Sequence, residues 1–259
     1  MTPTIAAPDL KSALDRVLIC ATKTPSRYRL DVVHFSSDGE ILSLSATDGH
    51  RMSMATIRVE LEPFKILVSI EDCKAIKRIC RRKSEIINIR VTASGLTFNN
   101  LKGDKVEVHP TGDVSEFPPL DHLLEADTTG TIPVLDPTEF RRGIRLAQIA
   151  RLDGEKNFKS DGSSNLVHVI STPRRMTVYG RSRQSRTKSV FHLDSDTRSS
   201  CVNFSVNANY VLDLLRLLPN DRPFEMKYWR NGTEGVVVQK EDFVHILCGI
   251  TEEKETRHV

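Results

Sequence analysis

Basic residues recur at helical spacing near the middle of the first half of the chain. Their positions follow i, i+3, i+4, i+7 and i+8, which places all of them on one face of an α-helix. The members are Lys74, Lys77, Arg78, Arg81 and Arg82. A one-sided row of cations suits the phosphates of a nucleic acid, because phosphate contacts release counterions without reading bases. The alternative is a solvated helix face that binds nothing.

A second basic cluster lies in the other half of the chain, where Arg141, Arg142 and Arg145 fall within one face of a predicted helix. Two basic helices favour a phosphate-binding surface. No aromatic residues alternate with these charges, so stacking on single-stranded bases is not indicated. A third basic run, from Arg181 to Lys188, suits an exposed strand edge or loop, where charge discourages edge pairing. A phosphate contact is the alternative there.

Motifs of common catalytic sites are absent from the sequence. There is no GxxxxGK[ST], no GxGxxG, no HExxH and no GxSxG. Asp48 and His50 lie near a predicted strand end, where turn chemistry is favoured over acid–base catalysis. The cysteines form no CxxC pair, and Cys73 and Cys80 suit core packing better than metal binding. We therefore predict a protein that is not an enzyme and holds neither a metal nor a cofactor.

Four helices are predicted to position these residues, over 9–23, 71–83, 136–151 and 207–218. Strand patterns fill the intervals, at 29–36, 41–46, 86–91, 96–99 and 106–109, and again at 166–190, 224–229, 236–239 and 243–250. The order of elements in the first half is repeated in the second. We predict an α+β fold of two domains, 1–126 and 127–259, each with two helices packed on antiparallel sheets. Two unrelated α+β domains are the alternative.

The composition is that of an ordinary folded protein. A chain of 259 residues accommodates two domains, and 39% of the residues are hydrophobic. The net charge is only +3, so the placement of charge, and not its total, argues for nucleic acid. No apolar run approaches the ~18 residues of a membrane span, and no signal peptide is indicated. With an odd number of cysteines, these features predict a cytoplasmic protein that does not contact membranes.

The run from Ala46 to Met52, Ala-Thr-Asp-Gly-His-Arg-Met, resembles a motif in the middle domain of the bacterial DNA polymerase III β subunit. That three-domain family is the ring-shaped sliding clamp. Further segments resemble it in the same order, at Arg27–Leu30, Ser115–Pro118 and Val206–Leu215. The resemblance covers about residues 5 to 250 and implies two domains of the DNA clamp fold. These correspond to the family's middle and C-terminal domains, and the family's first domain is expected to be missing.

The resemblance implies a processivity factor for DNA replication or repair. The family's ring has six similar domains from two chains, so a two-domain chain would need three copies. We expect a homotrimeric ring that encircles duplex DNA without sequence specificity, with the basic helices lining the hole. It would tether a polymerase or repair protein, and an ATP-driven clamp loader would open it. The alternative is a chain that closes no ring and, as an accessory protein, binds clamp-interacting peptides and regulates replication or repair.

The family also has a pocket between its middle and last domains for short peptides containing glutamine and leucine. By the resemblance, apolar positions here would hold the peptide's apolar side chains and polar positions would hydrogen-bond it. The matching positions are Leu30, Thr47, Gly49, His50, Arg51, Met52, Pro118 and Leu123 in the first half, and Asn207, Tyr210, Ile246, Cys248 and Ile250 in the second. The alternative is that these are core and turn residues at a domain junction. The chain departs from the family at 248–251, and a polar tail follows.

Overall fold

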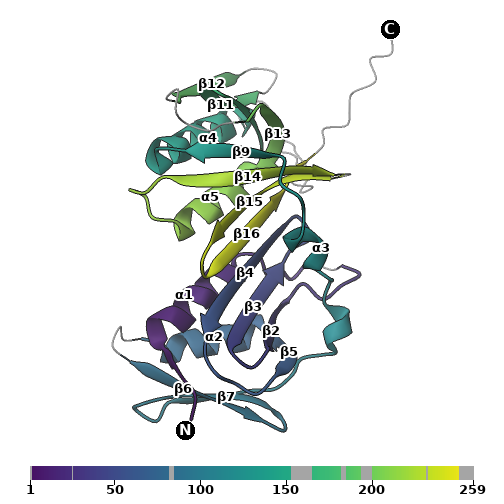
Figure 1. Cartoon of the computed structure of the whole chain (residues 1–259), viewed down its shortest axis with the longest axis vertical. Helices are drawn as coiled ribbons and strands as arrows, with labels where there is room; N and C mark the ends of the chain where they lie inside the picture. The colour runs from purple at the N-terminus through teal and green to yellow at the C-terminus, as the bar shows by residue number, and fades with distance from the viewer. Residues whose placement is uncertain are drawn as a thin grey trace. The chain divides into compact units, whose positions relative to one another are not determined.

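The computed structural model describes residues 2–24, 26–81, 85–152, 165–181, 185–193, 200–231 and 233–250 (Figure 1). The chain forms two compact units, one of Met1–Leu124 with Gln239–His245, the other of Glu125–Val238 with Ile246–Val259. Helices and antiparallel sheets occur in both units, which confirms the predicted α+β class. The segment Gln239–His245 belongs to the first unit although it follows the second in sequence, and the sequence pattern did not predict this.

The first unit carries two groups of antiparallel strands. The strands β2 (Val32–Ser37), β3 (Ile41–Thr47), β4 (Arg51–Arg58) and β5 (Phe64–Ser69) pair in the order β5-β2-β3-β4. The strands β1 (Thr4–Ala6), β6 (Ile86–Thr92), β7 (Gly95–Asn100) and β8 (Lys105–Val108) form a sheet in the order β1-β6-β7-β8. The helices are α1 (Ala7–Leu18), α2 (Ile70–Ile79), a short 3-10 turn η1 (Val114–Glu116) and α3 (Asp121–Leu124).

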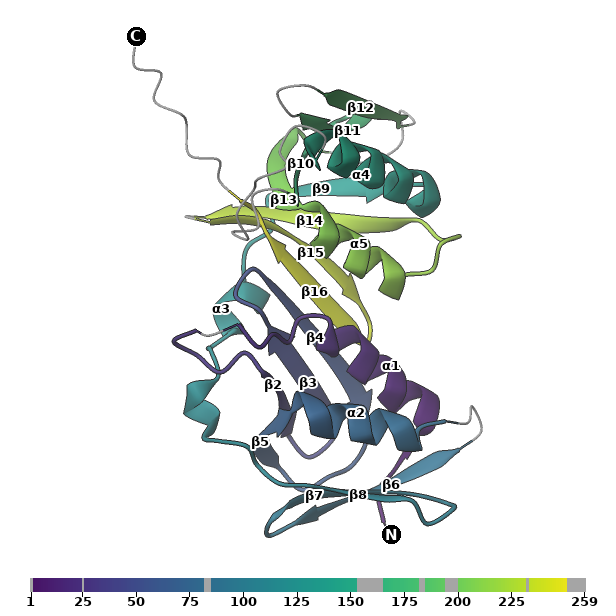
Figure 2. The same cartoon turned by 180° about the vertical axis from the view of Figure 1, so that it is seen from behind.

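The core of the first unit lies around α1 and α2. Figure 2 shows the two helices side by side, between strands β2–β5 and the sheet β1-β6-β7-β8. Leu10 and Leu14 of α1 and Ile76 of α2 are fully buried, together with Phe35 of β2 and Phe98 of β7. Since one apolar stripe of each helix faces the sheets, the opposite stripe is left to carry polar and charged residues.

Both helices of the first unit end earlier than the sequence pattern predicted. Helix α1 ends at Leu18 and not at Lys23, and α2 ends at Ile79 and not at Lys83. At Cys80 the backbone leaves the helix, with φ −87° and ψ 53°, and its N–H bonds to the Lys77 carbonyl. The predicted extension would have stacked like charges at i and i+4, such as Lys77 with Arg81, which disfavours a helix. The helical basic row is therefore correct only from Lys74 to Arg78.

The second unit repeats helices and strands in a similar order. Its strands are β9 (Gly130–Val134), β10 (Leu166–Thr172), β11 (Arg175–Arg181), β12 (Arg186–His192), β13 (Val202–Asn207), β14 (Phe224–Asn231) and β15 (Thr233–Lys240). Its helices are α4 (Pro137–Leu152) and α5 (Ala208–Leu217). The sheet order is β12-β11-β10-β13, while β14 pairs with both β9 and β15. The last strand, β16 (Phe243–Cys248), has its first half in the first unit and its second half in the second.

Helix α4 packs closely on one face of the sheet β12-β11-β10-β13. A Cβ atom at Gly180 would lie 1.9 Å from the Ala147 carbonyl oxygen, so only glycine allows this approach. Phe140 of α4 meets Phe191 of β12 edge to face, with ring centroids 6.1 Å apart. Within the described part of the chain, no helix combines the length and apolar character needed to cross a membrane.

His245 of β16 is a buried imidazole at the end of the segment Gln239–His245, which belongs to the first unit. It is 0% exposed, and neither ring nitrogen has a hydrogen-bond partner among the described residues. Burial, followed by the positive charge of Arg51, lowers the pKa of His245 to about 3. The folded protein therefore holds this ring neutral over a range of pH in which the unfolded chain protonates it.

Acid is expected to destabilise the protein through His245. The pKa of His245 is lower in the folded protein than its value of about 6.5 in the unfolded chain. The stability that depends on the neutral ring is therefore fully present above pH 6.5 and is lost as the pH falls toward 3. When the pH falls from 7.5 to 5.0, protonation of His245 in the unfolded chain should lower the free energy of unfolding of the wild type by about 2 kcal/mol. A His245→Leu variant lacks this group and should not show that loss. Urea unfolding at the two pH values measures the difference. The exposed His122→Gln variant should keep the wild-type pH dependence, and an unaltered dependence in His245→Leu would contradict the assignment.

Candidate functional site

The cationic residues of α2 are exposed, with one exception. Lys74, Arg78 and Arg81 are exposed and make no ion pair with the described residues. Lys77 instead pairs with Asp15 of the neighbouring helix α1. Arg81 lies just after the helix, and its Nε donates to the Arg78 carbonyl over 2.7 Å. The first unit therefore offers Lys74, Arg78 and Arg81 to an anion, while Arg82 lies outside the described residues.

The three arginines of α4 differ in their surroundings. Arg142 and Arg145 are exposed, and Arg142 has Glu139 at 3.7 Å. Arg141 is half-buried, and its guanidinium donates to the Leu215 carbonyl in α5. The predicted DNA contact of Arg141 is thus weakened by the structure, because its side chain ties the two helices of the second unit together.

The motif from Thr47 to Met52 forms the turn between β3 and β4. Asp48 Oδ1 accepts hydrogen bonds from the backbone N–H groups of His50 and Arg51, both at 3.0 Å. Asp48 Oδ2 accepts from Arg51 Nε at 2.8 Å, and each side chain of this pair is only 10% exposed. Gly49 has φ +87°, a conformation that favours glycine. The turn therefore uses Asp48, Gly49 and Arg51 to hold its own shape.

The remaining residues of the motif divide into buried and exposed. The Thr47 hydroxyl donates to the Arg51 carbonyl at 2.7 Å and accepts from Gly49 N–H at 3.1 Å. Met52 is opposite Thr47 in the ladder and is 1% exposed. His50 is exposed on the turn. Among these side chains His50 is the most accessible to a ligand.

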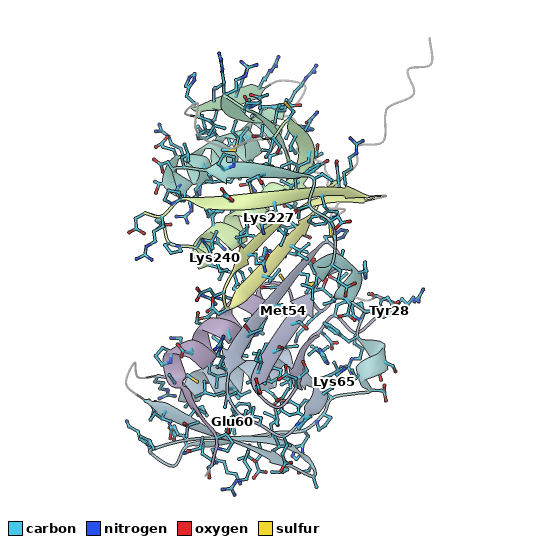
Figure 3. The ribbon with its side chains drawn as sticks, in the orientation of Figure 1. Tyr28, Met54, Glu60, Lys65, Lys227 and Lys240 are labelled. Atoms are coloured by element: carbon cyan, nitrogen blue, oxygen red, sulfur yellow. The ribbon has the colours of Figure 1, made fainter. Side chains whose placement is uncertain are left out.

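Pro118 and Leu123 lie half-buried on the segment that follows η1, and Leu30 is buried. A small apolar cluster of Val32, Leu67, Phe117 and Leu120 holds this segment against the strands. Phe117 also stacks on His34, with ring centroids 5.4 Å apart. Burial, and then the charge of Lys65 on β5, lower the pKa of His34 (Figure 3). The sequence interpretation missed this cluster, although the Phe-Pro-Pro run at 117–119 marks the place.

The second set of predicted peptide contacts also contains both buried and half-buried residues. Asn207 caps α5, since its side chain accepts from Asn209 N–H at 2.9 Å. Ile246 is fully buried, while Tyr210, Cys248 and Ile250 are half-buried. The Ile250 N–H donates to the Ser205 carbonyl at 2.8 Å. This set lies entirely in the second unit and the first set entirely in the first.

Cys73 of α2 and Cys80, which follows this helix, are packing residues, as predicted. Cys73 and Cys80 are buried, and burial raises the pKa of both thiols, that of Cys80 to about 11. Such thiols are poor nucleophiles. Among the described residues there is no cluster of three or more His, Cys, Asp or Glu that could hold a metal ion.

Comparison with known proteins identifies the fold. Residues 4–107 match a family model described as DNA polymerase III beta subunit, central domain, which includes the motif from Ala46 to Met52. No curated protein matches the sequence. Two solved structures are similar: the DNA polymerase sliding clamp of Bacillus subtilis, with TM-score 0.81 and 16% identity over 98% of this chain, and the β subunit of Thermotoga maritima, with TM-score 0.80 and 14% identity over 98%.

The β chain of Streptococcus pneumoniae gives a TM-score of 0.79 at 17% identity over 97% of this chain. The chain spans 65% of the length of the Bacillus subtilis clamp and 66% of that of Thermotoga maritima. At these identities the similarity establishes the fold. The predicted clamp fold and the predicted resemblance to the β-subunit family, over part of its length, are both confirmed.

Proposed function

We propose that this sliding-clamp-type protein encircles duplex DNA and tethers a polymerase or repair protein, without catalysing a reaction itself. The observation that carries the proposal is a clamp fold with exposed cations on one helix of each unit. These are Lys74 and Arg78 on α2, and Arg142 and Arg145 on α4. Lysine and arginine contacts to phosphates hold DNA without reading its sequence, so a ring can slide along it. A tethered polymerase then gains effective concentration at its template.

Ring closure is proposed to need three copies, because six units complete the ring of the similar family. Two features support head-to-tail contacts between copies. Strands β8 and β12 are the terminal strands of their sheets, and terminal strands offer unpaired backbone groups. Helix α4 also leaves Leu146 41% exposed and Ile149 55% exposed, an apolar pair suited to an interface. We propose that β12 and α4 of one copy meet the β8 edge of the next.

The proposed partners are those expected of a sliding clamp. Short peptides of polymerases and repair proteins would contact the two predicted sets of residues, and an ATP-driven loader would open the ring. The protein would act in the cytoplasm. In the first set, the accessible members Pro118, Leu123 and His50 would make the peptide contacts, while Met52 and Leu30 would support them from within the core.

Replacing Leu123 by Asp is expected to weaken peptide binding at least tenfold, because a charge would replace a half-buried apolar contact. Fluorescence anisotropy with a labelled peptide containing glutamine and leucine measures the affinity. Leu101→Asp, at a position 70% exposed in the same unit, is the matched control and should bind like the wild type. Equal affinity in Leu123→Asp and wild type would remove Leu123 from the site. Met52→Asp is unsuitable here, since burying a charge at a position 1% exposed would unfold the unit.

The proposed function is tested by solution mass and by retention on circular DNA. Light scattering should find a species of about 88 kDa, three times the 29.2 kDa of one chain. The protein is diluted until the ring dissociates, mixed with circular duplex and concentrated again, so that rings assemble around the DNA without a loader. Retention that is lost when the circle is linearised indicates encirclement. A persistent monomer that still binds peptide would favour the accessory protein instead.

A further inference from the structure

The sheet β12-β11-β10-β13 has a second face that α4 does not cover. Val169 and Val178 are paired in the ladder and buried, and Gly180 follows on the same side against α4. Because strand side chains alternate, Tyr179 and Arg181 stand on the opposite side of β11. Figure 3 shows long side chains with nitrogen ends standing above β11 and β12 at this end of the second unit.

This uncovered face is strongly basic. A shallow groove of about 300 Å³ is lined by Arg175 and Arg181 of β11 and by Arg186 and Lys188 of β12. Lys188 is opposite Tyr179 in the ladder, and Arg181 is opposite Arg186. An anion bound in this groove would therefore meet cations of both strands.

The sheet itself supplies no carboxylate. The four strands β10, β11, β12 and β13 contain no Asp or Glu. Arg175, Arg186 and Lys188 are exposed and have no ion-pair partner among the described residues. The sequence interpretation of this run as an exposed strand edge is confirmed for β12, but it did not indicate that the charges share one face with β11.

An aromatic pair lies among the cations. Tyr179 stacks on His168 of β10, with centroids 4.6 Å apart and an interplanar angle of 17°. His168 Nδ1 is in turn 2.8 Å from the Ser205 hydroxyl on β13, which fixes the ring. Cations and aromatic rings on an open sheet are the combination that single-stranded nucleic acid uses, because unpaired bases stack while phosphates meet the cations. Helix α2 contains no aromatic residue, and Phe140 of α4 is buried.

We propose that the open face of the sheet β12-β11-β10-β13 binds single-stranded nucleic acid without sequence specificity. Arg175, Arg181, Arg186 and Lys188 contact the phosphates, and the Tyr179–His168 pair supports a base. An acidic polypeptide would satisfy the charges but would make no use of the stacked rings. This surface is separate from the cations of α2 and α4, so the inference does not depend on ring closure.

The test uses the full chain and a labelled thymidine oligonucleotide of about 12 nucleotides, within the usual site sizes. Arg175→Gln with Lys188→Gln should weaken binding at least tenfold and reduce the slope of log affinity against log salt by about 1.4, at ~0.7 per phosphate contact. Tyr179→Leu should weaken binding about fivefold and leave the slope unchanged. The double variant Arg90→Gln with Lys102→Gln removes the same charge from two exposed positions of the first unit, on β6 and on the turn before β8, and should bind the oligonucleotide like the wild type.

The outcomes separate the alternatives. Unchanged affinity in the Arg175→Gln, Lys188→Gln variant, with a wild-type unfolding midpoint, would overturn the proposal. Wild-type binding by Tyr179→Leu, together with equal competition by polyglutamate at matched charge, would assign the face to an acidic polypeptide and also overturn it. A uridine oligonucleotide run in parallel distinguishes RNA from DNA. Loss of oligonucleotide binding with duplex retention intact would support this surface independently of the clamp function.

Discussion

Reversing the charge of Arg78 and Arg81 is expected to release the protein from circular duplex DNA. Both side chains are exposed and make no ion pair among the described residues. Their replacement by Glu removes the proposed phosphate contacts and breaks one exposed internal hydrogen bond, from Arg81 Nε to the Arg78 carbonyl. In a trimer, the double variant converts cations of every copy into repelling anions. Because each lost phosphate contact lowers affinity and its salt dependence, we expect retention to fall at least a hundredfold.

The matched control for this experiment makes the same change in net charge at two other positions of the first unit. Arg90→Glu with Lys102→Glu alters two exposed cations of the same unit, on β6 and on the turn before β8. This variant should stay on circular DNA nearly as long as the wild type. If both double variants lose retention equally, the effect comes from total charge and the helix assignment is wrong. Lys77 is avoided because its pair with Asp15 stabilises the contact between α1 and α2.

Placing Asp at Leu146 and Ile149 is expected to dissociate the proposed trimer into single chains. These side chains are 41% and 55% exposed, so the substitutions should leave the folded unit intact. Two carboxylates in the proposed interface would lose their hydration when the copies meet, and this desolvation opposes assembly. Light scattering should find the mass falling from about 88 kDa to 29.2 kDa.

Leu135→Asp provides the control for assembly, since Leu135 is 41% exposed in the same unit but precedes α4. It should assemble like the wild type. A Leu146→Asp, Ile149→Asp variant that keeps the trimer mass would exclude this face of α4 from the interface. The same variant also links the proposals, because a dissociated chain should bind peptide while losing its hold on circular DNA.

Several elements follow directly from local residue patterns. Helix α5 begins where Asn207 supplies an N-cap, and β3 begins after the Asp38-Gly39 turn. The strands β4 and β5 were not predicted. In β4, buried Ser53 lies beside buried Met52, which breaks the apolar–polar alternation on which a strand prediction depends. Pairing with β3 supplies the stability that its own sequence does not indicate.

Residue types and spacing predicted only part of the candidate sites. Asp48 and His50 were interpreted as turn residues and not as catalytic ones, and both lie in the turn between β3 and β4. Arg51 was predicted only as a peptide contact, and its ion pair with Asp48 was not foreseen. Arg141 was grouped with Arg142 and Arg145 on spacing alone. The carbonyl of Leu215, which engages Arg141, is brought to it only by the packing of α5. Spacing within one helix carries no information about a neighbouring helix.

The sequence by itself determined the α+β class, the apolar stripes of the helices and the resemblance to the β-subunit clamps. These depend on local periodicity and short motifs, which survive without knowledge of packing. Only the tertiary structure decided that Lys77 is paired with Asp15 while Arg78 is exposed, and that the cations of β11 and β12 share an uncovered face. Exposure and ion pairing depend on which distant segments pack against a residue, and that is a property of the fold.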